Sequence, residues 1–108
     1  MTTALSDNSL LMVPLAAIPA QMLRVTLSGQ TIQIALRQRS TGLYADFWLG
    51  NARVLSGVLC QDRTWQARDA ATGLPGDFTF ADSQGNQDPD YQTLGNRCLL
   101  FYRAGWGA

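Results

Sequence analysis

Alternation of apolar and polar residues, with a period of two, is the feature of this sequence that most restricts its fold. The stretch LRVTLSGQTIQIALR, residues 23–37, holds two alternating runs joined at Gly29. In the first run Leu23, Val25 and Leu27 fall on the same side. Successive side chains of a β-strand point to opposite faces, and glycine readily adopts the backbone of a tight turn. These residues therefore predict a β-hairpin with one buried face.

Further strands are predicted along the rest of the chain. The alternation continues through LYADFWLGNARVLSGVLC, residues 43–60, with a Gly-Asn turn in the middle. FTFADS at 78–83 and RCLLFYR at 97–103 predict two more strands, and a polar stretch rich in turn residues joins them. The stretch 62–77 is less regular, and we expect a short helical turn within it. Short strands with glycine-rich turns predict an all-β fold, an antiparallel barrel or sandwich of about six to eight strands.

An apolar stretch precedes the hairpin. LLMVPLAAIPAQMLRVTL, residues 10–27, carries a single charge near its end and contains Pro14 and Pro19. A membrane-spanning helix needs around 20 consecutive apolar residues, and each proline removes a helical hydrogen bond, so we expect no membrane segment. Residues before proline favour extended geometry. We expect an extended apolar N-terminal arm over 1–22, packed on its own domain or on a partner, and a single β-domain over 23–108.

The charged residues are of two types only. All eight basic residues are Arg and all eight acidic residues are Asp, so the net charge is zero and Lys, Glu and His are absent. Nucleic-acid affinity rests largely on clustered Lys and Arg, so this balance argues against a nucleic-acid partner. Arginine without lysine is typical of protein interfaces, although a GC-rich genome would give the same bias.

Much common enzyme chemistry is excluded by composition. Without His, neither a His-based nucleophilic triad nor a His-containing zinc site can form. Two cysteines cannot close a structural zinc site, and no Lys exists for a phosphate-binding loop. Cys60 and Cys98 lie in apolar runs, where we expect free thiols in the core of a protein made in a reducing cytosol. We expect no enzyme, no cofactor and no metal.

Two carboxylate features leave alternatives open. Asp46, flanked by Tyr44, Phe47 and Trp48, could serve acid–base catalysis with a second Asp, as in glycosidases, but an outward-facing strand residue paired with an Arg is the favoured interpretation. The loop DSQGNQDPD places side-chain oxygens at alternate positions, as calcium loops do, but lacks the closing Glu. A polar loop with Asx turns is favoured there. The oxygen-bearing residues are Asp82, Gln84, Asn86, Asp88 and Asp90.

Aromatic residues raise a third alternative, a base-stacking platform on a small barrel. Such a platform also needs a cationic groove, whereas the arginines are scattered and offset by aspartates. Core and interface roles are therefore favoured. The candidates are Trp48, Trp65, Trp106, Tyr44, Tyr91 and Tyr102.

Three segments taken together resemble the phage baseplate plug family, known from a contractile-tailed cyanophage. VPLAAIPAQMLRVTLSGQTIQIALR is similar to its opening element, GLYADFWLGNARVLSGVLC to its aromatic-rich central element, and DPDYQTLGNRCLLFY to its closing element. The resemblance covers residues 11–103, with 18–21 and 90–95 the most specific parts. It is poor over 63–76 and does not extend to the terminal RAGWGA.

The resemblance implies a structural component of a contractile phage tail baseplate. The protein would be a virion component without catalytic activity, a plug at the centre of the baseplate. Its partners would be the hub, the tail tube and neighbouring plug subunits, within a homo-oligomeric three-fold or six-fold assembly. The residues alone also allow a second hypothesis, a small β-barrel binding module for an oligonucleotide or a peptide. A glycosidase is the third hypothesis.

In the baseplate role, the arm would lie along a neighbouring subunit and add main-chain hydrogen bonds at a sheet edge. The hypothesis names nine partner-binding residues, most of them in the arm. They are Leu11, Val13, Pro14, Leu15, Ile18, Pro19, Gln21, Trp48 and Trp106.

Overall fold

The computed structural model describes residues 10–68 and 72–105, and the regular secondary structure within them is almost entirely β-strand. This confirms the all-β prediction. Seven strands form in these two ranges, and the 3-10 turn η2 (Tyr91–Thr93) lies before the last of them. The strands are β1 (Leu10–Val13), β2 (Ala20–Leu27), β3 (Gln30–Arg39), β4 (Gly42–Leu49), β5 (Ala52–Leu59), β6 (Gly76–Asp82) and β7 (Cys98–Ala104).

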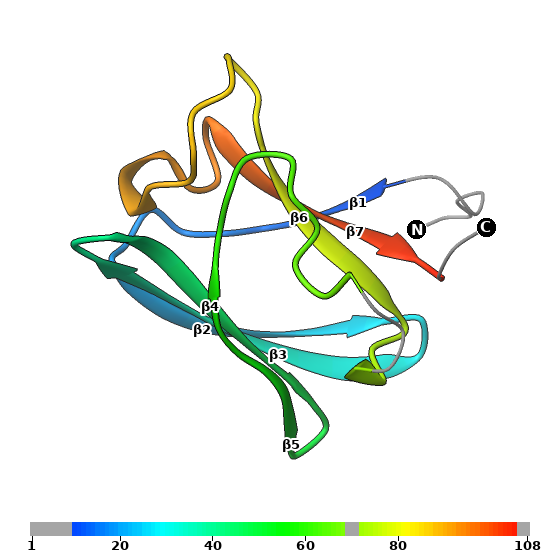
Figure 1. The fold of residues 1–108 in the computed structure, drawn as a ribbon. Helices are drawn as coiled ribbons and strands as arrows, with labels where there is room; N and C mark the ends of the chain where they lie inside the picture. The colour runs from blue at the N-terminus through cyan, green and yellow to red at the C-terminus, as the bar shows by residue number, and fades with distance from the viewer. Residues whose placement is uncertain (1–9, 69–71, 106–108) are drawn as a thin grey trace.

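Two antiparallel sheets make up the fold. One has three strands in the order β1-β7-β6, and the other has four strands in the order β2-β3-β4-β5. Figure 1 shows the two sheets as separate layers that meet across the core, with β1 beside β7. Neither sheet closes on itself, so of the two predicted architectures the chain adopts the sandwich and not the barrel.

The predicted hairpin forms and is longer than the alternation alone indicated. Strands β2 and β3 pair from Ala20 opposite Arg37 to Leu27 opposite Gln30. The turn between them has positive φ at both central residues, 52° at Ser28 and 75° at Gly29. Such a two-residue turn matches the right-handed twist of the flanking strands.

Aromatic rings join the two sheets at the centre of the core. The ring of Phe47 on β4 lies 5.0 Å from that of Phe78 on β6, which lies 5.1 Å from that of Tyr102 on β7. The Tyr102 hydroxyl and the Ser28 Oγ are 2.8 Å apart and share a hydrogen bond. The polar end of a buried tyrosine is thereby satisfied by the β2–β3 turn.

Both cysteines are free and buried, as the sequence predicted. Burial raises the pKa of the Cys98 thiol to about 12 and also raises the pKa of the Cys60 thiol well above its usual range. Both thiols are therefore protonated at neutral pH and pack as small apolar groups.

The irregular stretch after β5 covers the outer edge of β6. Isolated bridges join Asp62 to Phe80 and Trp65 to Thr79. The carboxylate of Asp77 accepts hydrogen bonds from the main-chain N–H groups of Ala67 and Arg68, both at 2.7 Å. The helical turn expected in this stretch falls partly on residues 69–71, which lie outside the described residues. Across the described ranges, none of the helical segments has the length and apolar character needed to cross a membrane.

Candidate functional site

The apolar stretch ahead of the hairpin is partly built into the chain's own sheet. Strand β1 pairs antiparallel with β7, from Leu10 opposite Arg103 to Val13 opposite Leu100. It is the outermost strand of its sheet, so within the described part of the chain its second edge has no strand partner. Residues 10–22, called the apolar segment below, therefore combine an internal contact with an open strand edge.

Side chains of the apolar segment divide between the core and the surface. Val13 is only 4% exposed and belongs to the core, and Leu15 packs against that core. Of the partner-binding candidates, Val13 therefore does not reach the surface. Leu11 and Ile18 do, with 38% and 45% of their surface exposed.

Hydrogen bonds fix the proline-containing link between β1 and β2. The Ala16 N–H donates to Gln21 Oε1 at 3.1 Å, and Gln21 Nε2 donates back to the Ala16 carbonyl at 2.6 Å. The Pro19 carbonyl accepts from the Gln38 N–H at 2.8 Å. Gln21, proposed from the sequence as a partner residue, thus holds the conformation of the link, while Pro14 and Pro19 are exposed.

Exposed apolar surface is concentrated in this one segment. Six large hydrophobic side chains are exposed among the described residues, and five of them lie within 10–22. They are Leu10 (46%), Leu11 (38%), Met12 (58%), Ile18 (45%) and Met22 (62%), and Leu59 is the sixth. Leu10 and Met12 lie two positions apart on β1 and so point to the same side of it, and exposed apolar surface of this kind marks interaction sites.

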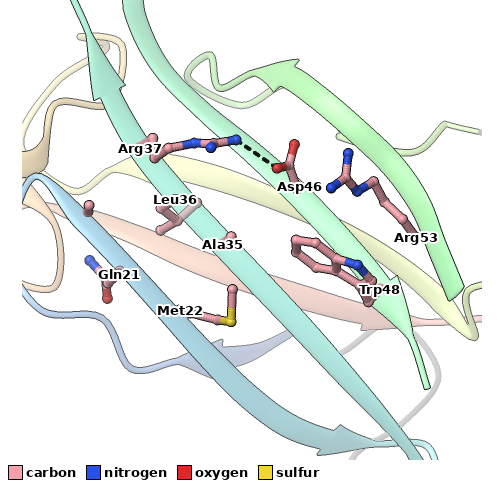
Figure 2. A pocket seen from close by; sticks show the side chains of 9 residues that line it. Gln21, Met22, Ala35, Leu36, Arg37, Asp46, Trp48 and Arg53 are labelled. Atoms are coloured by element: carbon pink, nitrogen blue, oxygen red, sulfur yellow. Dashed lines mark hydrogen bonds and ion pairs between the residues drawn. The ribbon is translucent and has the colours of Figure 1, made fainter. Parts of the chain in front are cut away.

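A groove of about 500 Å3 lies on the outer face of the four-stranded sheet. Register places Met22 of β2 opposite Ala35 of β3, and Ala35 opposite Asp46 of β4. Figure 2 shows these side chains with Trp48 and Arg53 on neighbouring strands. The guanidinium of Arg53 lies 5.2 Å from the centroid of the Trp48 ring. The groove is lined by Ala20, Gln21, Met22, Ala35, Leu36, Arg37, Asp46, Trp48 and Arg53.

Asp46 has a structural partner on each side. Its Oδ2 accepts a hydrogen bond from Arg37 Nη2 at 2.8 Å (Figure 2), and its Oδ1 accepts from the Gly57 N–H at 2.6 Å. The β4–β5 register shifts next to Asp46, and Gly57 has φ of 62°, so the carboxylate supports a β-bulge. The ion pair with an Arg that the favoured interpretation included is confirmed, but Asp46 is only 4% exposed and so is not the solvent-facing residue expected.

The polar loop after β6 is organised by the carboxylate of Asp82. Arg97 donates to both of its oxygens, at 2.7 and 2.8 Å, and the N–H groups of Gln84 and Gln87 donate at 2.9 Å each. The Arg97 hydrogen bonds hold the pKa of Asp82 well below its usual range. The bond from Gln84 closes an Asx turn, the favoured interpretation of this loop.

The other acidic residues of the loop face N–H donors as well. Asp88 accepts from the Asp62 N–H at 3.0 Å, and Asp90 caps η2 by accepting from the Gln92 N–H at 2.8 Å. Gln84 and Asn86 are exposed. Among residues 10–68 and 72–105, no three or more His, Cys, Asp or Glu side chains form a group suited to a metal ion.

The candidate aromatic residues do not share one face. Tyr102 lies in the core, Tyr91 packs against it, and Trp65 lies under the Arg103 guanidinium at 4.3 Å on the other sheet. Trp48 and Tyr44 are on the outer face of the four-stranded sheet, each beside an arginine. Trp106 lies outside the described residues.

The exposed Leu10, Met12 and Met22 lie within the predicted apolar arm but were not among the candidate partner-binding residues, and the arginines beside the groove were not predicted. A usable signal was present, because residues 20–59 contain four arginines and one aspartate in a chain of zero net charge. Counting charge by segment, and not over the whole chain, would have indicated a basic face.

Comparison with known families gives one finding. The family model described as cyanophage baseplate Pam3 plug gp18 matches residues 10–105. The match spans the strands from β1 to β7. No match was found among curated proteins.

Proposed function

Because this chain belongs to the cyanophage baseplate plug family and is therefore a structural baseplate component, we propose that it forms the plug at the centre of that baseplate. In this role it contacts the hub, the tail tube and neighbouring copies of itself in a three-fold or six-fold ring. It acts by binding and not by catalysis. In support, Asp46 and Asp82, the carboxylates that matched catalytic or metal patterns, have both oxygens engaged by N–H donors.

The apolar segment carries this proposal. Five of the six exposed large hydrophobics of the described chain lie within it. β1 contains neither charge nor proline, the features with which proteins usually protect an open strand edge. A partner strand can add to this edge through main-chain hydrogen bonds.

The pairing of β1 with β7 gives the side chains of the apolar segment two different roles. Val13 and Leu15 hold it to the chain's own core. Leu10, Met12 and Ile18 meet the partner, and Leu11 contributes the part of its surface that remains exposed. The arm therefore acts as an anchored edge strand, with its outward side offered to the baseplate.

Substitution of exposed residues tests the proposal without removing a strand. In a Leu10→Asp, Met12→Asp variant, we expect a folded protein that no longer co-purifies with co-expressed hub and tube proteins, because each carboxylate would be desolvated at the interface. Leu59→Asp is the matched control, since Leu59 is exposed but lies outside the segment. Circular dichroism verifies the fold of all three proteins. Normal incorporation of the double variant would contradict the proposal.

A further inference from the structure

We propose that the groove on the outer face of the four-stranded sheet is a second docking site, which receives an extended acidic segment of a partner protein. One large apolar side chain of that segment packs against Met22 and Trp48, and its carboxylates meet the arginines at the rim. That the partner is a baseplate protein rests on the function proposed above. The groove and its charges, by contrast, are features of this chain alone and do not depend on that function.

The floor of the groove is an unpartnered apolar surface. Met22 is 62% exposed in the middle of β2. Its neighbours across the sheet are Ala35 and then Asp46, whose small side chains leave space beside it. Gln33 Nε2 donates to the Met22 sulfur at 3.1 Å and holds this side chain over the sheet. A flexible thioether at a surface groove can adapt to different apolar groups of a ligand.

The rim of the groove is positively charged. Arg53 lines the groove on one side and Arg37 on the other. Asp46 is the only acidic residue of 20–59, is 4% exposed, and forms an ion pair with Arg37. Among the described residues, Arg53 has no carboxylate partner, and neither has Arg24 on the same face.

Charge complementarity identifies the occupant. Residues 20–59 carry a formal charge of +3, from four arginines and one aspartate, whereas the remainder of the chain carries −3. The positive charge is thus gathered on the sheet that bears the groove. An acidic segment gains favourable electrostatics there, and its apolar side chain removes the Met22 surface from water.

A peptide suits this groove better than a nucleic acid does. Base binding needs aromatic faces on which bases can stack. Trp48 is the one aromatic residue among those that line the groove, and the Arg53 guanidinium lies over its ring at 5.2 Å, so successive bases have no row of rings to stack on. The apolar floor of the groove carries no group that would bind the phosphates of a nucleic acid.

Fluorescence anisotropy of the full chain with a labelled hexapeptide of alternating Asp and Leu tests the proposal. Two control peptides replace Asp by Asn or Leu by Ser, which removes the charge or the apolar group. We expect each control to bind at least tenfold more weakly than the acidic apolar peptide. Arg53→Glu should also weaken binding at least tenfold. Arg39→Glu, the same charge change on the same sheet but outside the groove lining, should change it less than threefold.

Other outcomes would overturn the proposal. Equal affinity for the three peptides, no binding at all, or tighter binding of a twelve-nucleotide poly-dT strand would each do so. Self-association that Arg53→Glu abolishes, without peptide binding, would assign the groove to a second copy instead. Failure here is distinguishable from failure of the plug function, because the Leu10→Asp, Met12→Asp variant keeps this groove intact and should still bind the peptide.

Discussion

Gly95 lies against the main chain of Leu15, so close that a Cβ on Gly95 would stand 2.3 Å from the Leu15 carbonyl oxygen. Gly95 follows η2 in the loop before β7, whereas Leu15 follows β1 at the other end of the chain. This contact therefore holds the apolar segment to the domain in addition to the pairing of β1 with β7 and of β2 with β3. Gly95 also has φ of +81°, which L side chains rarely adopt.

We expect Gly95→Ala to destabilise the protein by more than the cost of placing alanine at positive φ, because its Cβ would also collide with Leu15. Gly29→Ala is the matched control, because Gly29 has φ of +75° and nothing within 4 Å of its would-be Cβ. The control should cost ~1–2 kcal/mol, and Gly95→Ala should cost a further ~1–3 kcal/mol for displacing Leu15. Urea unfolding measures both. Equal losses would mean that the Leu15 contact yields without cost.

Asp46→Ala should destabilise the protein by ~1–3 kcal/mol, because the part-buried hydrogen bond from the Gly57 N–H to the charged carboxylate is lost. Asp46→Asn keeps an acceptor oxygen and loses only the ion pair with Arg37, whose side chain is 52% exposed. An ion pair with a partner this exposed contributes little, so the Asn variant should lose less than ~1 kcal/mol. Thermal unfolding distinguishes the two. If the Asn variant were as unstable as the Ala variant, the ion pair and not the bulge would be the main role of Asp46.

Acid should weaken the loop that Asp82 organises. A carboxylate whose pKa is lower in the folded chain than in the unfolded chain stabilises the fold above the unfolded value, ~3.9, and loses that contribution as the pH falls towards the folded pKa. Hydrogen bonds from Arg97 lower the pKa of Asp82 in this way. We expect Asp82→Asn to lower Tm at pH 7, and the difference in Tm from the unsubstituted protein to shrink below about pH 4.

Asp90→Asn serves as the control for that series, because asparagine caps a helical turn about as well as aspartate does. The Asp90 carboxylate accepts from the Gln92 N–H and is not one of the groups bound to Asp82. It should leave Tm at pH 7 nearly unchanged. A difference between Asp82→Asn and the unsubstituted protein that stayed constant from pH 7 to pH 3 would contradict the role assigned to the Asp82 charge.

Both thiols should be inert until the protein unfolds. The thiolate is the reactive form, and burial raises the pKa of Cys98 to about 12 and that of Cys60 in the same direction. At pH 8 we expect 5,5′-dithiobis(2-nitrobenzoate) to label the native chain roughly a hundredfold or more slowly than the chain in guanidinium chloride. Rapid labelling of either cysteine in the native state would show that the core opens readily at that position.

Local pattern was sufficient for the strands from β2 to β7 and for the faces of the central hairpin. Ile32, Ile34 and Leu36 are buried, while Thr31 and Arg37 at the two ends of this run are exposed, as the alternation predicted. The reason is that the direction of a side chain in a strand depends only on its position along that strand. The family resemblance, which rests on ordered motifs, was likewise readable from the sequence and is confirmed by the match over residues 10–105.

The candidate surfaces could be predicted only in part from the sequence. The apolar segment was identified by its composition, but which of its side chains face inward depends on the pairing of β1 with β7, some 90 residues later. The groove was not predicted, because Met22, Ala35 and Asp46 belong to three strands and meet only through cross-strand register. The place of Asp46 opposite Gly57 depends in the same way on the irregularity between β4 and β5.

The amino-acid sequence by itself determined the strands from β2 to β7, the hairpin turn at Ser28 and Gly29, the buried thiols and the absence of histidine and lysine chemistry. Each of these follows from residue type or from neighbours a few positions away. Only the tertiary structure decided that Val13 anchors the apolar segment within its own chain, and that a basic groove forms on the opposite sheet. Both depend on strands that are distant in sequence coming together, and long-range pairing of this kind is set by the packing of the whole core.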